Sequence, residues 1–223
     1  MIWPGETMAI SDRKKREKEY RRQSIIDAAE KLFFEKGYDN VSMNDIAGVV
    51  ELNRATIYLY FENKEALCFA VILRGVRMLN GMVKNHVKNA AYTQKIIAFG
   101  AAHDLFFQLH PQYVQVYNLF QSGRFDISSL RRPAWDDVYE IIGLQKEMFD
   151  MLHSAIKTEK GTGTISSDMN SHYAAILIIS TIDSMLNPSP ILKKEIKNMK
   201  IDKYQGFSRD FITFINQLFR NKQ

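Results

Sequence analysis

The side chains best suited to read a DNA duplex are concentrated in residues 42–65, SMNDIAGVVELNRATIYLYFENKE. Arg54 can donate two hydrogen bonds to the edge of a guanine, and Thr56 and Tyr58 carry hydroxyl groups that can reach bases or phosphates. This chemistry requires a helix that presents its first residues to a groove of the duplex. The pattern therefore predicts contact with DNA rather than catalysis.

Two short helices joined by a tight turn would position these side chains. Ser42 is a good N-cap for the first helix, and Asp45 three residues later completes a capping box. Asn53 is placed to accept a hydrogen bond from the backbone N–H of Thr56 and so to start the second helix. Apolar residues at helical spacing turn one side of each helix toward a core: Ile46, Ala47 and Val50 in the first, Ile57 and Phe61 in the second. This arrangement is typical of a helix-turn-helix.

Residues 22–67 resemble the DNA-binding domain of the tetracycline-repressor (TetR) family over about 46 residues without a gap. The resemblance departs at Glu51, where the family usually has a turn glycine, and at Ala55, where many members have glycine. A left-handed backbone at Glu51 would cost on the order of 1 kcal/mol, whereas alanine at position 55 favours the helix. The matching positions are Ile25, Ala28-Ala29, Leu32-Phe33, Gly37-Tyr38, Ser42, Asp45-Ile46-Ala47, Thr56-Ile57-Tyr58, Tyr60-Phe61, Lys64-Glu65 and Leu67.

The resemblance also implies which residues contact DNA. Ser42 and Asn44 are expected to reach a phosphate or a base. Arg54, Ala55, Thr56 and Tyr58 are expected to enter the major groove. Tyr60 and Lys64 are expected to hold phosphates and so to position the domain. The implied set is Ser42, Asn44, Arg54, Ala55, Thr56, Tyr58, Tyr60 and Lys64.

The composition is that of a globular protein, with 223 residues of which 46% are hydrophobic and 25% charged. Cys68 is the only cysteine, so no intrachain disulfide can form, and we interpret it as a small core residue. No uninterrupted run reaches the roughly 20 apolar residues of a membrane span, and the first ten residues lack the pattern of a signal peptide. We therefore expect a cytoplasmic protein with no membrane partner.

Apolar residues recur at helical spacing along the chain, which predicts an all-α fold of about nine helices. The expected domains are a flexible basic arm over 1–17, a three-helix helix-turn-helix domain over 18–66, and a helical effector-binding and dimerisation domain over 67–223. Gly37 is expected to end the first helix. Besides the helix-turn-helix, helices are expected near 18–36, 64–90, 93–109, 111–122, 133–158, 167–187 and 204–221.

Residues 11–22, SDRKKREKEYRR, hold seven basic and three acidic groups, although residues 1–67 as a whole hold 11 and 12. This local net charge of +4 favours contact with phosphates or the minor groove beside the helix-turn-helix. The alternative is a solvated helix start that is stabilised by ion pairs such as Arg13–Glu17.

One recognition helix reads too few base pairs to be selective, so a two-fold dimer that reads two half-sites is expected. The helices near 167–187 and 204–221 are apolar on more than one side, and the resemblance implies that the last two helices form a four-helix bundle between two copies. The alternative is a deep core within one chain. The candidate interface residues are Tyr173, Leu177, Ser180, Thr181, Phe211, Phe214 and Leu218.

The middle of the chain is rich in aromatic residues, which indicates either core packing or the wall of a small-molecule cavity. The resemblance implies a cavity among the middle helices for an unknown effector, apolar or aromatic in character. The candidate lining residues are His103, Asp104, Phe107, Tyr113, Tyr117, Trp135 and Tyr139.

Together these features predict a ligand-responsive repressor that binds a palindromic operator as a homodimer and is released by a small-molecule effector. That the effector weakens DNA binding rather than strengthening it is implied by the resemblance alone. One alternative is a helical interaction or ligand-binding protein that has kept the fold without operator binding. A helical enzyme is the other alternative, although the sequence has no catalytic motif and no histidine pair at metal-site spacing, so we predict no catalytic residue, metal or cofactor.

Overall fold

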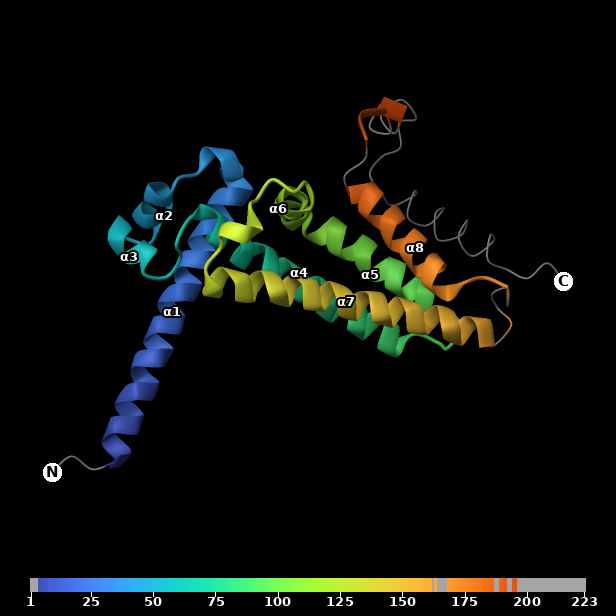
Figure 1. The fold of residues 1–223 in the computed structure, drawn as a ribbon, viewed down its shortest axis with the longest axis horizontal. Helices are drawn as coiled ribbons and strands as arrows, with labels where there is room; N and C mark the ends of the chain where they lie inside the picture. Colours follow the sequence, from blue (N-terminus) through green and yellow to red (C-terminus); the bar gives the residue numbers. More distant parts are fainter. Residues whose placement is uncertain (1–3, 162, 164–167, 187–188, 192–193, 196–223) are drawn as a thin grey trace. The chain divides into compact units, whose positions relative to one another are not determined.

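The computed structural model describes residues 4–161, 163, 168–186, 189–191 and 194–195. Within these ranges the chain forms eight α-helices and two short 3-10 helices and contains no strand (Figure 1), which confirms the all-α prediction. The helix expected near 204–221 lies outside the described residues. In chain order the elements are α1 (Pro4–Lys36), η1 (Tyr38–Asn40), α2 (Met43–Val49), α3 (Arg54–Tyr58), α4 (Lys64–Asn89), α5 (Lys95–Leu109), α6 (Pro111–Gln121), η2 (Ile127–Ser129), α7 (Arg132–Gly161) and α8 (Ser171–Leu186).

Helix α1 buries one stripe of its C-terminal half and exposes residues 12–21. It begins at Pro4 rather than near residue 18, because the Lys, Arg and Glu residues before position 18 are good helix formers that continue the same helix. It ends at Lys36, where Gly37 takes a φ of 77° and its N–H donates to the Phe33 carbonyl at 3.0 Å, so the predicted stop at Gly37 is confirmed. The buried stripe is the predicted one: Ile25, Ala28, Ala29, Leu32 and Phe33.

Helix α4 is the most apolar long helix of the described chain. Among the described residues it is the one helix whose length and composition would allow it to cross a membrane, although the sequence analysis had found no such stretch. The sequence prediction missed it because Arg74 and Arg77 interrupt the apolar run. However, 67% of its most apolar window is buried, including Cys68, which identifies α4 as a core helix.

The described residues form two compact units. Unit 1 contains the chain up to Leu73 together with residues 123–138, and unit 2 contains residues 74–122 and the chain from Tyr139 onward. Residues 123–138 fall within the expected C-terminal domain, 67–223, but their contacts group them with the N-terminal helices. Unit 1 therefore carries α2 and α3 and also the segment that connects α6 to α7.

Polar side chains join α4 to α7 within unit 2. Arg77 donates from Nε and Nη2 to the two carboxylate oxygens of Glu140, each at 2.6 Å. The Asn80 amide donates to Glu147 Oε2 at 3.2 Å, and Lys84 Nζ lies 2.8 Å from Glu147 Oε1. Successive contacts of this kind fix the register between the two helices against which α5 and α6 pack.

Helix α5 is capped by a residue from another helix. Gln94 precedes α5 but makes no capping hydrogen bond with its side chain. Instead the buried carboxylate of Glu159 in α7 accepts a hydrogen bond from the Ile96 N–H at 3.1 Å. Burial raises the pKa of Glu159, while the backbone N–H groups of α5 oppose that rise.

Candidate nucleic-acid interface

A capping box fixes the start of α2. Ser42 Oγ accepts a hydrogen bond from the Asp45 N–H at 3.2 Å, and Asp45 Oδ2 accepts one from the Ser42 N–H at 2.7 Å. The Ser42 hydroxyl also donates to Asp45 Oδ2 at 2.6 Å, and these bonds hold the pKa of Asp45 below its usual value. The predicted N-cap is confirmed. Because its one hydroxyl hydrogen is already engaged, Ser42 acts first as a cap and has no second hydrogen to offer a phosphate.

The turn between α2 and α3 passes through the left-handed region at Glu51, whose φ is 54°. It is closed by a hydrogen bond from the Leu52 N–H to the Ala47 carbonyl at 3.0 Å. The left-handed turn that the resemblance implies therefore forms at a non-glycine residue, at a cost on the order of 1 kcal/mol relative to glycine. The turn sets the direction in which α3 leaves α2.

Helix α3 is capped as the sequence predicted. Asn53 Oδ1 accepts hydrogen bonds from the Thr56 N–H at 2.8 Å and from the Thr56 hydroxyl at 2.9 Å. Ile57 is fully buried and Phe61 nearly so, and they anchor the helix to the core of unit 1. One face of this short helix is therefore held inward and the opposite face must point to solvent.

The exposed face of α3 carries a paired arginine and tyrosine. Arg54 Nη2 donates to the Tyr58 hydroxyl oxygen at 3.0 Å, and its guanidinium carbon lies 5.3 Å from the centre of the tyrosine ring. Both side chains are exposed. The phenol restrains the guanidinium, and the Tyr58 hydroxyl keeps its own hydrogen for another acceptor. This pair offers a cation and a hydroxyl donor at the position where a helix-turn-helix reads a groove.

The other predicted contact residues differ in how accessible they are. Asn44 and Ala55 are exposed, whereas Tyr60 is half-buried and lines a pocket of about 170 Å³ beside Arg22 and Asp137. Accessible candidates are thus grouped around α3 and the start of α2.

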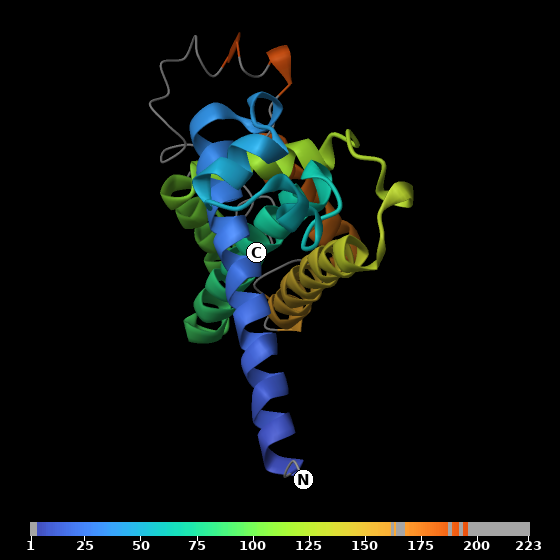
Figure 2. The same cartoon turned by 90° about the vertical axis from the view of Figure 1, so that its left-hand side faces the viewer.

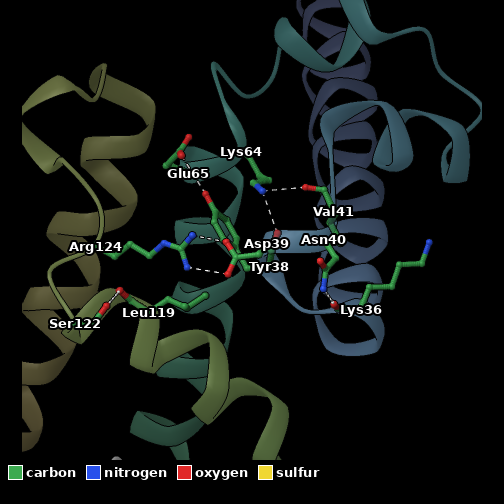
Figure 3. Close-up of polar contacts among 10 residues, drawn as sticks. All are labelled: Lys36, Tyr38, Asp39, Asn40, Val41, Lys64, Glu65, Leu119, Ser122 and Arg124. Atoms are coloured by element: carbon green, nitrogen blue, oxygen red, sulfur yellow. Dashed lines mark hydrogen bonds and ion pairs between the residues drawn. The ribbon is translucent and has the colours of Figure 1, made fainter.

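Lys64 is engaged inside the domain. Its ammonium donates to the carbonyls of Tyr38 and Val41, each at 3.0 Å, and lies 4.1 Å from the centre of the Tyr38 ring (Figure 3). Two of its three hydrogens therefore hold the chain between η1 and α2 against the start of α4. This role competes with the phosphate contact that the resemblance implied.

A cluster around Tyr38 ties the segment after α6 into unit 1. Arg124 forms a two-point ion pair with Asp39, and its Nη1 donates to Asp39 Oδ2 at 2.9 Å (Figure 3). The Tyr38 hydroxyl donates to Glu65 Oε1 at 3.1 Å, and burial together with the Glu65 charge raises the pKa of Tyr38. Phe125 packs edge-on against Tyr38 at 5.4 Å between ring centres.

Sequence reasoning missed this cluster. Asp39 and Arg124 lie 85 positions apart, and neither belongs to a periodic apolar pattern. The one signal available was the aromatic character of Tyr38 and Phe125, which does not indicate that the two rings contact each other.

Comparison with known proteins gives the same assignment as the geometry. Residues 25–71 match the model of bacterial regulatory proteins of the tetR family. A curated relative is the negative transcriptional regulator IcaR of the biofilm operon icaADBC in Staphylococcus aureus (strain Newman), 30% identical over 102 residues that cover 43% of this chain and 51% of IcaR. The chain thus spans about half the length of the curated relatives it matches.

The tetR-family match thus covers the part of the chain that carries α2 and α3. Solved structures share the fold of this chain over most of its length. A regulator from Saccharomonospora viridis in complex with choline is 16% identical, with a TM-score of 0.70 over 92% of this chain and 100% of that one. AibR in complex with isovaleryl coenzyme A and operator DNA is 20% identical, with a TM-score of 0.56 over 74% of this chain and 85% of that one.

Helix α8 has one buried and one exposed apolar face within unit 2. Ala174, Ala175, Ile178 and Ile182 are buried. Of the predicted interface residues, Tyr173 and Leu177 are 68% and 60% exposed, Ser180 is exposed, and the half-buried Thr181 donates to the Leu177 carbonyl at 2.8 Å. Phe211, Phe214 and Leu218 lie outside the described residues.

The seven ligand candidates differ in how deeply they are buried. His103 and Tyr113 are buried, and Asp104, Phe107 and Tyr117 are half-buried, all in unit 2. Tyr139 is 75% exposed and Trp135 is 39% exposed, so neither side chain is buried as His103 and Tyr113 are. Both residues follow Pro133 in the first turns of α7 and face solvent there.

The buried candidates offer two kinds of polar group. His103 Nδ1 donates to the Phe99 carbonyl at 2.9 Å, and burial lowers the pKa of His103 to about 4, so its ring is neutral at physiological pH. The Tyr117 hydroxyl oxygen accepts from the Gln121 amide at 3.3 Å and from the Gln145 amide, and burial raises its pKa to about 12. The Gln145 contact, from α7, was not predicted from the sequence.

Proposed function

We propose that this tetR-family protein is a ligand-responsive transcriptional repressor that binds a palindromic operator as a homodimer. The observation that carries the proposal is the exposed Arg54–Tyr58 pair at the start of a capped helix whose other face is fixed by Ile57 and Phe61. Such a helix can enter a major groove with its polar face already ordered, which limits the conformational entropy lost on binding. IcaR, a negative regulator, supports repression over activation.

Dimerisation is supported by the exposed side of α8. Tyr173, Ile176, Leu177 and Ser180 follow the i, i+3, i+4, i+7 spacing of one helix face, and the three apolar members are exposed. An apolar stripe of this kind is typical of an interface between subunits. Two copies joined through it would present two α3 helices to neighbouring turns of one duplex, roughly 34 Å apart.

Release by a small molecule is supported by the aromatic and polar side chains inside unit 2. The neutral His103, the buried Tyr113 ring and the Tyr117 hydroxyl with its two glutamine partners can enclose an apolar molecule and orient one polar group of it. Structural relatives were solved with choline and with isovaleryl coenzyme A. An effector that favours a different separation of the α3 helices would weaken operator binding by its differential affinity, typically about 1–3 kcal/mol.

The test is selection of operator sequences from a pool of random duplexes by the purified full chain, followed by binding measurements on the selected duplex. The proposal expects an inverted repeat, and it expects Arg54→Ala to weaken binding to that repeat while leaving the unfolding midpoint unchanged. Recovery of no preferred sequence would favour an interaction protein of the same fold. A compound library screened for loss of duplex binding would then identify the effector, in the cytoplasm where we place the protein.

A further inference from the structure

The helix-turn-helix of this protein has an unfavourable charge for a DNA-binding domain. Residues 23–67 contain four basic and eight acidic residues, a net charge of −4, and residues 123–138 of the same unit contain three of each. Neutralisation of phosphates supplies most of the sequence-independent affinity of a protein for DNA. Arg54 is exposed on α3, whereas Lys64 is committed to two carbonyls, so the helix-turn-helix itself offers few cations to phosphates.

The missing positive charge lies on the N-terminal half of α1. Residues 12–22, the basic helix segment, hold seven basic and three acidic side chains. The side chains of residues 12–21 are all exposed, so no apolar contact holds this part of the helix in place. An isolated helix of this length is marginal in water, and this one is continuous with the packed half of α1.

Most of these cations have no acidic partner. Glu17 pairs with Arg21 at 3.5 Å, an i,i+4 ion pair of the kind expected for a solvated helix start, and it does not pair with Arg13. Glu19 accepts from the Gln23 amide at 2.7 Å. Among the described residues, no carboxylate forms an ion pair with these five side chains: Arg13, Lys14, Lys15, Arg16 and Lys18.

Helical geometry gathers part of this charge into a ridge. Lys14, Lys18 and Arg21 follow i, i+4, i+7 spacing and lie within about 60° of one another around the helix axis. Asp12 and Glu19 fall on the opposite side by the same rule. The segment is therefore basic along one face, and it spans about 15 Å, or roughly four base pairs of duplex.

The base of the segment is fixed to unit 1. Arg22 donates to Asp137 Oδ2 at 2.9 Å, and its guanidinium carbon lies 5.2 Å from the centre of the Phe61 ring. In Figure 1, α3 and the N-terminal end of α1 both lie at the left edge of unit 1. Figure 2 views that edge and shows α1 running down and away from α2 and α3. The basic helix segment and α3 thus share a side, and the segment extends beyond the helix-turn-helix.

We propose that the basic helix segment is the main phosphate-binding surface of this protein and lies along the DNA backbone outside each half-site. The inference rests on the proposed function and adds to it a helical clamp that extends the contacted duplex by roughly four base pairs per subunit. The base-reading helix then supplies selectivity while the segment supplies sequence-independent affinity. Association with DNA becomes strongly dependent on salt for this reason.

The test compares two full-length variants that lose the same charge. Lys14→Gln/Lys15→Gln/Lys18→Gln removes three cations from the segment with a residue that keeps helix propensity. Lys88→Gln/Lys157→Gln/Lys194→Gln removes three exposed lysines of unit 2 and is the matched control. Affinity for a 40-base-pair duplex of mixed sequence is measured by fluorescence anisotropy between about 50 and 300 mM NaCl, with circular dichroism to compare helix content.

The segment variant should reduce the slope of log K against log salt by about 2.7, since each phosphate contact contributes about 0.9, and should lower affinity at 0.1 M salt on the order of 10²-fold. The control should keep the wild-type slope. Equal slopes in the wild-type protein and the segment variant would overturn the inference while leaving operator recognition by α3 intact. A wild-type protein that binds no duplex at any salt concentration would overturn both.

Discussion

Gly75 of α4 lies close to Tyr113 of α6, and replacing it by alanine is a sharp test of how unit 2 is packed. A Cβ atom at position 75 would lie 2.5 Å from Cδ1 and 2.9 Å from Cγ of Tyr113. That ring is buried and packs against Phe106 and His110, with ring centres 6.3 and 6.1 Å away. The ring therefore cannot move aside without disturbing its neighbours.

Two opposing effects set the magnitude. Alanine is favoured over glycine in a helix interior by about 1 kcal/mol. Carbon atoms are normally separated by about 3.5–4.0 Å, so the new methyl group would overlap the ring by roughly 1 Å, and overpacking of this kind costs about 1–3 kcal/mol. Gly75→Ala should therefore be neutral or destabilising by up to about 2 kcal/mol.

Gly81 supplies the matched control, because it lies in the same helix and a Cβ atom there would meet nothing within 4 Å. Gly81→Ala should stabilise the protein by up to about 1 kcal/mol. The difference between the two variants cancels helix propensity and leaves the overlap, about 1–3 kcal/mol. Chemical denaturation followed by far-ultraviolet circular dichroism measures both, and adding Tyr113→Ala to each should remove the difference. Equal stabilisation by the two alanines would refute the close contact.

Three further predictions concern recognition and ionisation. Arg54→Ala should weaken binding to the selected operator by about 1–3 kcal/mol in anisotropy titrations, and Tyr58→Phe, which removes the acceptor for the arginine but keeps the ring, should weaken it less; equal affinity in both variants and the wild type would exclude the pair from the interface. Burial lowers the pKa of His103 to about 4, so below pH 6.5 the unfolded chain binds a proton that the folded chain does not. Stability should fall with pH below that value, by about 2 kcal/mol at pH 5 relative to a His103→Gln variant, and parallel pH profiles would contradict the assignment. Because burial raises the pKa of Glu159, its ionisation opposes folding as pH rises above the usual carboxyl range. Glu159→Gln should remove the loss of stability that this ionisation causes between pH 4 and 7, measured as denaturation midpoints, while keeping an acceptor for the Ile96 N–H. An unchanged pH profile would argue against a buried carboxylate there.

The elements that are set by local chemistry were the ones the sequence predicted well. Ser42, Asp45 and Asn53 specify the two helix starts through side chains three residues apart, and the structure contains each of those hydrogen bonds. Gly37 likewise ends α1 where predicted, because only a residue tolerant of positive φ fits there. Glu51 shows that the turn geometry persists even where the favoured glycine is absent.

What the sequence could not predict depends on contacts between distant positions. No local sequence pattern indicates that the Lys64 ammonium donates to the carbonyls of Tyr38 and Val41 instead of binding a phosphate. Similarly, the sequence around Arg124 does not indicate that its side chain pairs with Asp39, 85 positions away. Aromatic content alone gave no measure of exposure.

Trp135 and Tyr139 show that a position in an aromatic-rich stretch does not make a side chain buried. They were grouped with His103 because all three lie in an aromatic-rich stretch, but helical phase places both at the surface of α7. The apolar pattern of α8 was more informative, since its two faces correspond to a buried side and an exposed side. The periodicity of apolar residues predicted which helix faces are buried, but it did not identify the residues that those faces contact.

In the proposed function, paired α3 helices read a two-fold DNA site. The most direct measurement is the mass, by analytical ultracentrifugation, of the complex between the purified chain and its selected duplex at low salt. The proposed function predicts two protomers on each inverted repeat. It predicts no complex of that mass on a duplex in which one half-site is scrambled. A single protomer that binds either duplex equally well would contradict it.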